Sequence, residues 1–224
     1  MSRLPIPRLR LSWQPSWHAD AVDDQHGPRI ALMHGLMAGN HMQRHLLQQV
    51  RDWSFADSSL FANHARPALI ADHLQRAARH GRPIVLIGYS QGGFLAVQVA
   101  RVLAQRGVAV DLLVTIAAGG LGRIYPAQWG VDPRPIPDNV KQVINAFSAV
   151  DRLGGDRRWL SNWAMPSHWQ TTVENIGLTA EHGIDHLALA RCYPADRVHP
   201  LVQRQLWDRL RVVLDGLGRG LHKD

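Results

Sequence analysis

The sequence predicts an α/β protein with a mostly parallel sheet and helices on both faces of that sheet. Two observations predict this class. Short continuous apolar runs, typical of strands buried on both faces, alternate with longer stretches of helical periodicity. Glycine or proline ends several of these stretches. A chain of 224 residues can bury a substantial core, so we expect residues 1–224 to form a single domain.

The elements follow from local patterns in chain order. Alternation of apolar and polar residues predicts a first strand over 9–13, with one exposed face. Apolar runs predict buried strands over 29–33, 84–87, 112–116 and 143–150, and residues 171–178 are the last strand candidate. Helical periodicity predicts helices over 41–53, 66–80 and 91–106, and a last helix that Pro200 opens. The segments 119–138 and 154–169 show neither pattern, and no long helical insertion follows Gly119, so we expect no large cap domain.

Composition excludes several functional classes. The formal net charge of +7 comes from 25 basic and 18 acidic residues, but the basic residues are scattered, which predicts no nucleic-acid partner. No apolar run reaches the roughly 18–20 residues that span a bilayer, so we expect no stable membrane insertion. Cys192 is the only cysteine, and the N-terminus lacks an uninterrupted apolar segment, which together favour a cytoplasmic protein. Nothing in the pattern indicates an oligomeric state.

The segment Gly88-Tyr89-Ser90-Gln91-Gly92 matches the pattern G-x-S-x-G. A buried strand is predicted to enter it and a helix to leave it, which is the context that this motif requires. A serine on such a sharp turn projects its hydroxyl outward, and the flanking glycines let neighbouring backbone pass without a Cβ clash. The alternative is an ordinary strand-to-helix turn that happens to contain a serine.

These residues resemble the α/β-hydrolase superfamily, and the resemblance covers about residues 29–216. The elbow GYSQG is similar to that of cutinases, and Asp185-His186-Leu187-Ala188-Leu189 is similar to the segment that carries the catalytic histidine of bacterial lipases and esterases. The resemblance implies an α/β-hydrolase fold and a nucleophile, acid and histidine in that chain order.

Three histidines follow the last predicted strand and could serve as the base. His186 lies where a polar turn meets an apolar stretch, within the lipase-like segment, and we favour it. His182 is the main rival, and His199 directly precedes Pro200 at a helix start.

For the acid we favour Asp151, which follows the predicted strand over 143–150 and so lies at the same sheet edge as Ser90. Asp156 is a second candidate. Asp111 begins a strand, which places it at the opposite edge, and Asp185 adjoins His186 and is expected to point elsewhere.

The resemblance also implies an oxyanion hole made by the backbone N–H groups of Gln91 and Leu36. Met37 and Tyr89 adjoin these positions and are candidate substrate contacts. Trp159 and Trp163 are either an apolar wall for an acyl chain or part of a satellite core. His41 and His45 have a spacing that metals can use, but without a third ligand we expect no metal, and the chemistry needs no cofactor.

The sequence therefore predicts a serine hydrolase that cleaves a small-molecule carboxylic ester through Ser90, His186 and Asp151. A thioesterase or an acyltransferase would use the same acyl-enzyme. A third interpretation is a non-catalytic protein of the same fold that binds an apolar ligand.

Overall fold

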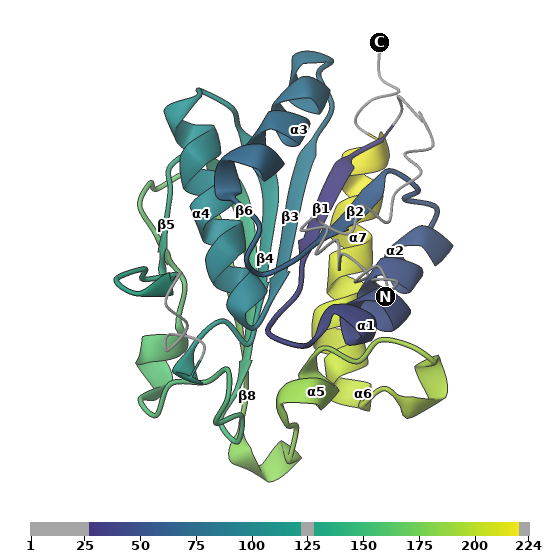
Figure 1. The fold of residues 1–224 in the computed structure, drawn as a ribbon. Coiled ribbons are helices and arrows are strands. Elements are labelled where there is room, and N and C mark those ends of the chain that lie inside the picture. The colour runs from purple at the N-terminus through teal and green to yellow at the C-terminus, as the bar shows by residue number, and fades with distance from the viewer. Residues whose placement is uncertain (1–26, 122–127, 220–224) are drawn as a thin grey trace, which may run out of the picture.

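The computed structural model describes residues 27–121 and 128–219. A six-stranded sheet with the order β2-β1-β3-β4-β6-β8 crosses the molecule, and every neighbouring pair is parallel (Figure 1). The strands are β1 (Arg29–Met33), β2 (Ser58–Phe61), β3 (Ile84–Tyr89), β4 (Val110–Ile116), β6 (Val140–Ser148) and β8 (Thr172–Leu178). The mostly parallel sheet predicted from the apolar runs is confirmed.

Helices cover both faces of the sheet, as predicted (Figure 1). On one face lie α3 (Pro67–Arg79) and α4 (Gln91–Gln105). On the other lie α1 (Gly39–Met42), a π-helical turn (Gln43–Leu47), α2 (Gln48–Asp52) and a C-terminal helical segment. That segment consists of α6 (Pro200–Val202), a second π-helical turn (Gln203–Trp207) and α7 (Asp208–Arg219). Each face has its own apolar cluster, which explains why the strand residues between them are apolar on both sides.

Short elements complete the carboxyl side of the molecule. A second sheet of two strands pairs β5 (Pro135–Ile136) with β7 (Met165–Pro166). The shorter helical elements include three 3₁₀ turns and the four-residue helix α5: Trp159–Asn162, Ala180–His182, Ala195–Arg197 and α5 (His186–Leu189). No large cap covers the sheet in the described residues, as expected.

The strand register places the end of β3 in the middle of the sheet. Gly88 pairs with Met33 of β1 on one side and with Thr115 of β4 on the other. The turn after β3 therefore emerges at the carboxyl edge between two neighbouring strand ends, where open parallel sheets bind ligands.

Two sequence-based expectations need correction. The strand predicted over 143–150 begins at Val140 and ends at Ser148, so Asp151 lies in the turn beyond the strand rather than directly at its end. β2 was not predicted at all. The strand predicted over 9–13 lies outside the described residues.

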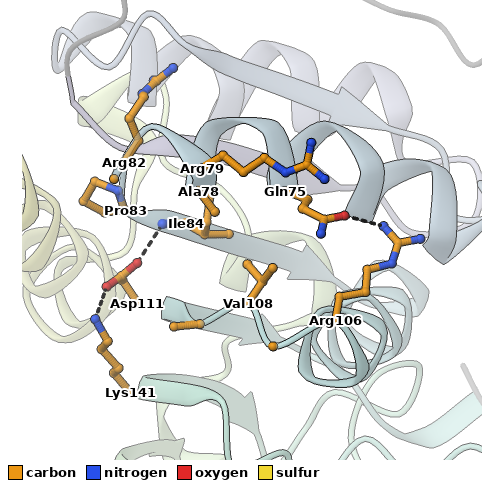
Figure 2. Close-up of a pocket in the computed structure, with 13 residues that line it drawn as sticks. Gln75, Ala78, Arg79, Arg82, Pro83, Ile84, Arg106, Val108, Asp111 and Lys141 are labelled. Carbon is orange, nitrogen blue, oxygen red and sulfur yellow. Dashed lines mark hydrogen bonds and ion pairs between the residues drawn. The ribbon is translucent and has the colours of Figure 1, made fainter.

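The opposite, amino edge of the sheet carries a basic cavity of about 460 Å³ (Figure 2). Its lining includes Arg79, Arg106 and Lys141, with Asp111 at the start of β4. The carboxylate of Asp111 accepts the Ile84 N–H at 2.8 Å and lies 2.7 Å from the Lys141 Nζ atom. Asp111 therefore lies at the edge away from Ser90, as its position at the start of a strand predicted, and it has a structural role there.

None of the described helices combines the length and apolarity that crossing a bilayer requires.

Candidate active site

Ser90 occupies a strained turn between β3 and α4. Its backbone has φ 55° and ψ −124°, a region that residues with a Cβ rarely adopt. Its N–H donates to the Ile116 carbonyl at 2.8 Å, and its own carbonyl accepts the Gly93 N–H at 2.9 Å. These two hydrogen bonds hold the turn, and such strain typically persists at functional sites.

The glycines on either side of Ser90 permit close backbone contacts. A Cβ on Gly88 would collide with the carbonyl of Gly92, and a Cβ on Gly92 would collide with the carbonyl of Met33. Only glycine therefore fits at the two G positions of the motif without moving backbone. The sequence pattern and its strand-turn-helix context both hold in the structure.

His186 and Asp151 lie in contact although 35 residues separate them. The Nδ1 atom of His186 is 2.8 Å from Oδ2 of Asp151, and the Asp151 side chain is fully buried. The other carboxylate oxygen accepts the N–H groups of Leu153 and Gly154, at 2.9 and 2.8 Å. A buried carboxylate held in this way fixes the orientation of an imidazole.

Two further residues lie against His186. The Tyr89 ring lies 4.8 Å from the His186 ring, and its hydroxyl donates to the His186 carbonyl at 3.0 Å. Burial raises the pKa of Tyr89 above its ordinary value, so the hydroxyl keeps its proton. A Cβ on Gly154 would lie 2.7 Å from the His186 Cε1 atom, so this glycine makes room for the ring.

The rival candidates have other contacts. His182 is half-buried and lies 3.1 Å from the hydroxyl of Thr179. His199 caps α6 by accepting the Leu201 N–H, and Asp185 caps α5 by accepting the Ala188 N–H. The backbone N–H of Asp156 donates to the Asn162 side chain at 2.6 Å. None of these four residues lines the cavity that contains Ser90.

The loop after β1 packs directly on Ser90. A Cβ on Gly35 would lie 2.7 Å from the Ser90 Cβ and 3.1 Å from its Oγ. The Gly35 carbonyl accepts the Ala38 N–H at 3.1 Å and lies 2.6 Å from the His34 Nδ1 atom. Leu36, in the middle of this tight loop, lines the same cavity as Ser90 and Gln91.

Ser90 and His186 open into one cavity of about 400 Å³. Four of the predicted residues lie in its wall: Leu36, Met37, Tyr89 and Gln91. Met37 is held at φ 56°, and its side chain is 95% exposed. The rest of the wall is mostly apolar and comes from Ala38, His41, Leu121, Leu153 and Leu187. Leu121, Leu153 and Leu187 are each about half exposed, so the entrance is apolar as well.

Trp159 and Trp163 do not line this cavity. The Trp159 ring packs edge-on against Phe147 with 4.8 Å between centroids, and it fills the space over Gly177 that a Cβ would occupy. Trp163 lies just before β7 and is 42% exposed. Of the two interpretations offered by the sequence, the contacts of Trp159 favour the satellite core.

His41 is a cavity residue that sequence reasoning considered only as a metal ligand. Its ring lies 4.2 Å from that of His45 and 6.1 Å from that of Tyr89. Burial, His45, Arg191 and His186 together lower the pKa of His41 to about 4, so its ring is neutral near neutral pH. Its position in the predicted helix directly after the Gly35 loop is the signal that could have placed it beside Ser90.

No group of three or more His, Cys, Asp or Glu side chains within residues 27–121 and 128–219 could hold a metal ion. Cys192 is buried, and burial raises the pKa of its thiol above the ordinary value, which makes it a poor nucleophile.

Comparison with known proteins gives one family-model match and several structures of similar fold. The family model of the thioesterase domain matches residues 65–120, which include the Ser90 turn and both flanking elements. A search of curated proteins gave no match. The structure is similar to Aspergillus fumigatus lipase B, with 16% identity, a TM-score of 0.54 and coverage of 86% of this chain and 57% of that one. It is also similar to an arylesterase, with 12% identity, a TM-score of 0.51 and coverage of 84% and 77%.

These structural similarities, together with the sheet order, show the fold of this chain. The protein has the α/β-hydrolase fold without a large cap in its described residues.

Proposed function

We propose that this protein is a serine hydrolase that cleaves carboxylic esters of apolar acids through Ser90, His186 and Asp151. One observation carries the proposal: Ser90 on its strained turn opens into the same cavity as His186, which is itself paired with the buried Asp151. The order serine, acid, histidine along the chain agrees with the superfamily.

In the proposed reaction, the Ser90 Oγ atom attacks the acyl carbonyl carbon while the His186 Nε2 atom accepts the hydroxyl proton. The carbonyl oxygen becomes an oxyanion, which the N–H groups of Gln91 and Leu36 stabilise. As the carbon–oxygen bond to the alcohol breaks, His186 gives its proton to the leaving oxygen. Water, deprotonated by His186, then attacks the acyl-enzyme and releases the acid and Ser90. Asp151 orients the imidazole and stabilises its protonated form.

The cavity wall supports an apolar acyl group. The side chains around the opening are Leu36, Met37, Leu121, Leu153 and Leu187, and within residues 27–121 and 128–219 no lysine, arginine, aspartate or glutamate joins them in the lining. A charged acyl group would therefore lose its hydration without a compensating partner. A cavity of about 400 Å³ is in the range of small-molecule sites.

A thioesterase is the second candidate, because the thioesterase family model matches the segment that contains Ser90. Ethyl octanoate and S-ethyl thiooctanoate have the same acyl group and differ only in the leaving atom. Titration of released acid should show higher kcat/KM for the ester with the wild-type protein, and no turnover with the Ser90→Ala variant. Higher kcat/KM for the thioester would favour the thioesterase. If the protein hydrolyses neither compound, nor the corresponding esters and thioesters with shorter acyl groups, the non-catalytic interpretation is favoured.

A further inference from the structure

The residue after the nucleophile, Gln91, has an unusual environment for the first residue of a helix. Its side chain is 6% exposed, although a glutamine at a helix start normally reaches solvent. Its Oε1 atom accepts a hydrogen bond from Asn63 Nδ2 at 2.5 Å. Its backbone carbonyl accepts a second one from Gln128 Nε2 at 2.8 Å. Asn63 and Gln128 are themselves buried, at 5% and 2% exposure.

The three residues come from separate parts of the chain. Asn63 follows the edge strand β2, and Gln128 lies between β4 and β5. Both side chains donate hydrogen bonds to Gln91, the first residue of α4. Burying three amides in one place costs desolvation that only good hydrogen bonds offset. Two hydrogen bonds therefore hold Gln91 in position, one to its side chain and one to its backbone carbonyl.

The orientation of the Gln91 N–H follows from the same backbone. In a trans peptide the carbonyl and the N–H point in opposite directions. The Ser90 carbonyl accepts the Gly93 N–H at 2.9 Å, so the Gln91 N–H in the same peptide plane points away from the helix interior. Such a donor must lie within a few tenths of an ångström of its best position relative to the developing oxyanion. Movement of residue 91 would change that position.

We propose that Asn63 and Gln128 are positioning residues for the oxyanion hole: through buried hydrogen bonds to the side chain and carbonyl of Gln91, they hold its backbone N–H in place for the transition state. This inference rests on the proposed function. Asn63 does not line the cavity, so it acts through Gln91 and touches no substrate.

The Asn63→Ala variant tests the proposal, with Asn139→Ala as its matched control. Asn139 donates to the Ala100 and Val108 carbonyls and directly precedes β6, at the amino edge of the sheet, whereas Ser90 lies at the carboxyl edge. Loss of Asn63 should lower kcat by about 10- to 100-fold with KM nearly unchanged. It should weaken binding of an alkyl trifluoromethyl ketone, which forms an oxyanion on Ser90, by a similar factor. Asn139→Ala should lower the melting temperature without changing either quantity.

A double-mutant cycle with Gln91→Met separates the contact from general destabilisation. Gln91→Met keeps the backbone N–H but removes the Oε1 atom that Asn63 contacts. If Asn63 acts through that contact, the double variant should lose no more kcat than the stronger single variant. Gln128→Leu should show the same kcat loss with KM retained. If Asn63→Ala fails to fold, Gln91→Met and Gln128→Leu still test the proposal by the same two quantities.

The outcomes are distinct from those that test the proposed function. Equal ketone affinity and equal kcat for Asn63→Ala and Asn139→Ala, or fully additive losses in the cycle, would overturn the positioning role while leaving the hydrolase intact. An inactive wild-type protein that Ser90-directed reagents do not modify would instead remove the proposed function itself.

Discussion

The carboxylate of Asp151 divides its two oxygens between His186 and the backbone of the following turn. Oδ2 lies 2.8 Å from the His186 Nδ1 atom, while Oδ1 accepts the N–H groups of Leu153 and Gly154. The second set of hydrogen bonds fixes the carboxylate, and the fixed carboxylate fixes the imidazole. This division of roles makes the acid assignment testable by a substitution that preserves shape.

The Asp151→Asn variant should fold but lose about 10³- to 10⁴-fold in kcat. The amide oxygen will remain with the two backbone N–H donors, so the amide NH₂ will face His186 Nδ1. The histidine proton then resides on Nε2, and this atom can no longer accept the Ser90 proton. Asp156→Asn is the control and should keep kcat close to the wild-type value. Ester hydrolysis at pH 7 measures both, and a larger loss for Asp156→Asn would contradict the assignment.

A comparison of His186→Ala with His182→Ala tests the base. His186 lines the Ser90 cavity and has the Asp151 partner, whereas His182 does not line that cavity and lies near Thr179. We expect His186→Ala to lose at least about 10³-fold in kcat and His182→Ala to keep its activity. The same ester assay suffices. Inactivity confined to His182→Ala would mean that another histidine approaches Ser90.

The Ser90 turn should not tolerate a side chain at Gly92. A Cβ there would meet the Met33 carbonyl at the carboxyl end of β1, so Gly92→Ala should lower the free energy of unfolding by about 1–3 kcal/mol. Gly216 lies within α7 with no atom near its Cβ position. Gly216→Ala should therefore raise the free energy by about 0.5–1 kcal/mol. Urea unfolding measures both, and a neutral Gly92→Ala would contradict the predicted clash.

His41 should make the protein less stable in mild acid. Its pKa is about 4 in the folded protein and 6.5 ordinarily, because of burial and then the charges of His45, Arg191 and His186. Between pH 6.5 and pH 4 the unfolded chain therefore binds a proton that the folded protein does not. Stability falls as pH decreases through this window and is unaffected above it.

The His41→Gln variant should show a smaller loss of unfolding free energy between pH 7 and pH 5 than the wild-type protein. Some pH dependence should persist, because burial also lowers the pKa values of His45 and His34. Urea unfolding at the two pH values provides the measurement. An identical pH dependence in the variant would show that His41 does not contribute.

The parts of the site that sequence predicted well are those in which local pattern and chemistry coincide. The apolar run into Gly88 and the helix after Ser90 define the turn, because a glycine on each side is needed where backbones cross. Asp151 was favoured from its place after a predicted strand, and His186 from its similarity to the lipase-like segment. The contact between the Asp151 carboxylate and the His186 ring could not be predicted from the sequence, because it depends on how the turn at Gly154 packs against that ring.

The parts that were missed lack a local signal. β2 has the sequence Ser-Ser-Leu-Phe without a β-branched residue, and its serines are buried because arginines contact them: Arg29 donates to Ser59 at 2.6 Å and Arg51 to Ser58 at 3.4 Å. Trp159 could not be oriented from its neighbours in sequence. It fills a space that Gly177 creates on β8, which only the folded sheet defines.

A fluorophosphonate probe provides the most direct test of the central claim, that Ser90 is a nucleophile activated by His186 and Asp151. Intact-mass measurement should show one adduct per wild-type chain, and peptide mapping should place it on Ser90. His186→Ala should react far more slowly, and Ser90→Ala should not react. A folded wild-type protein that remains unmodified, or an adduct on another residue, would contradict the account.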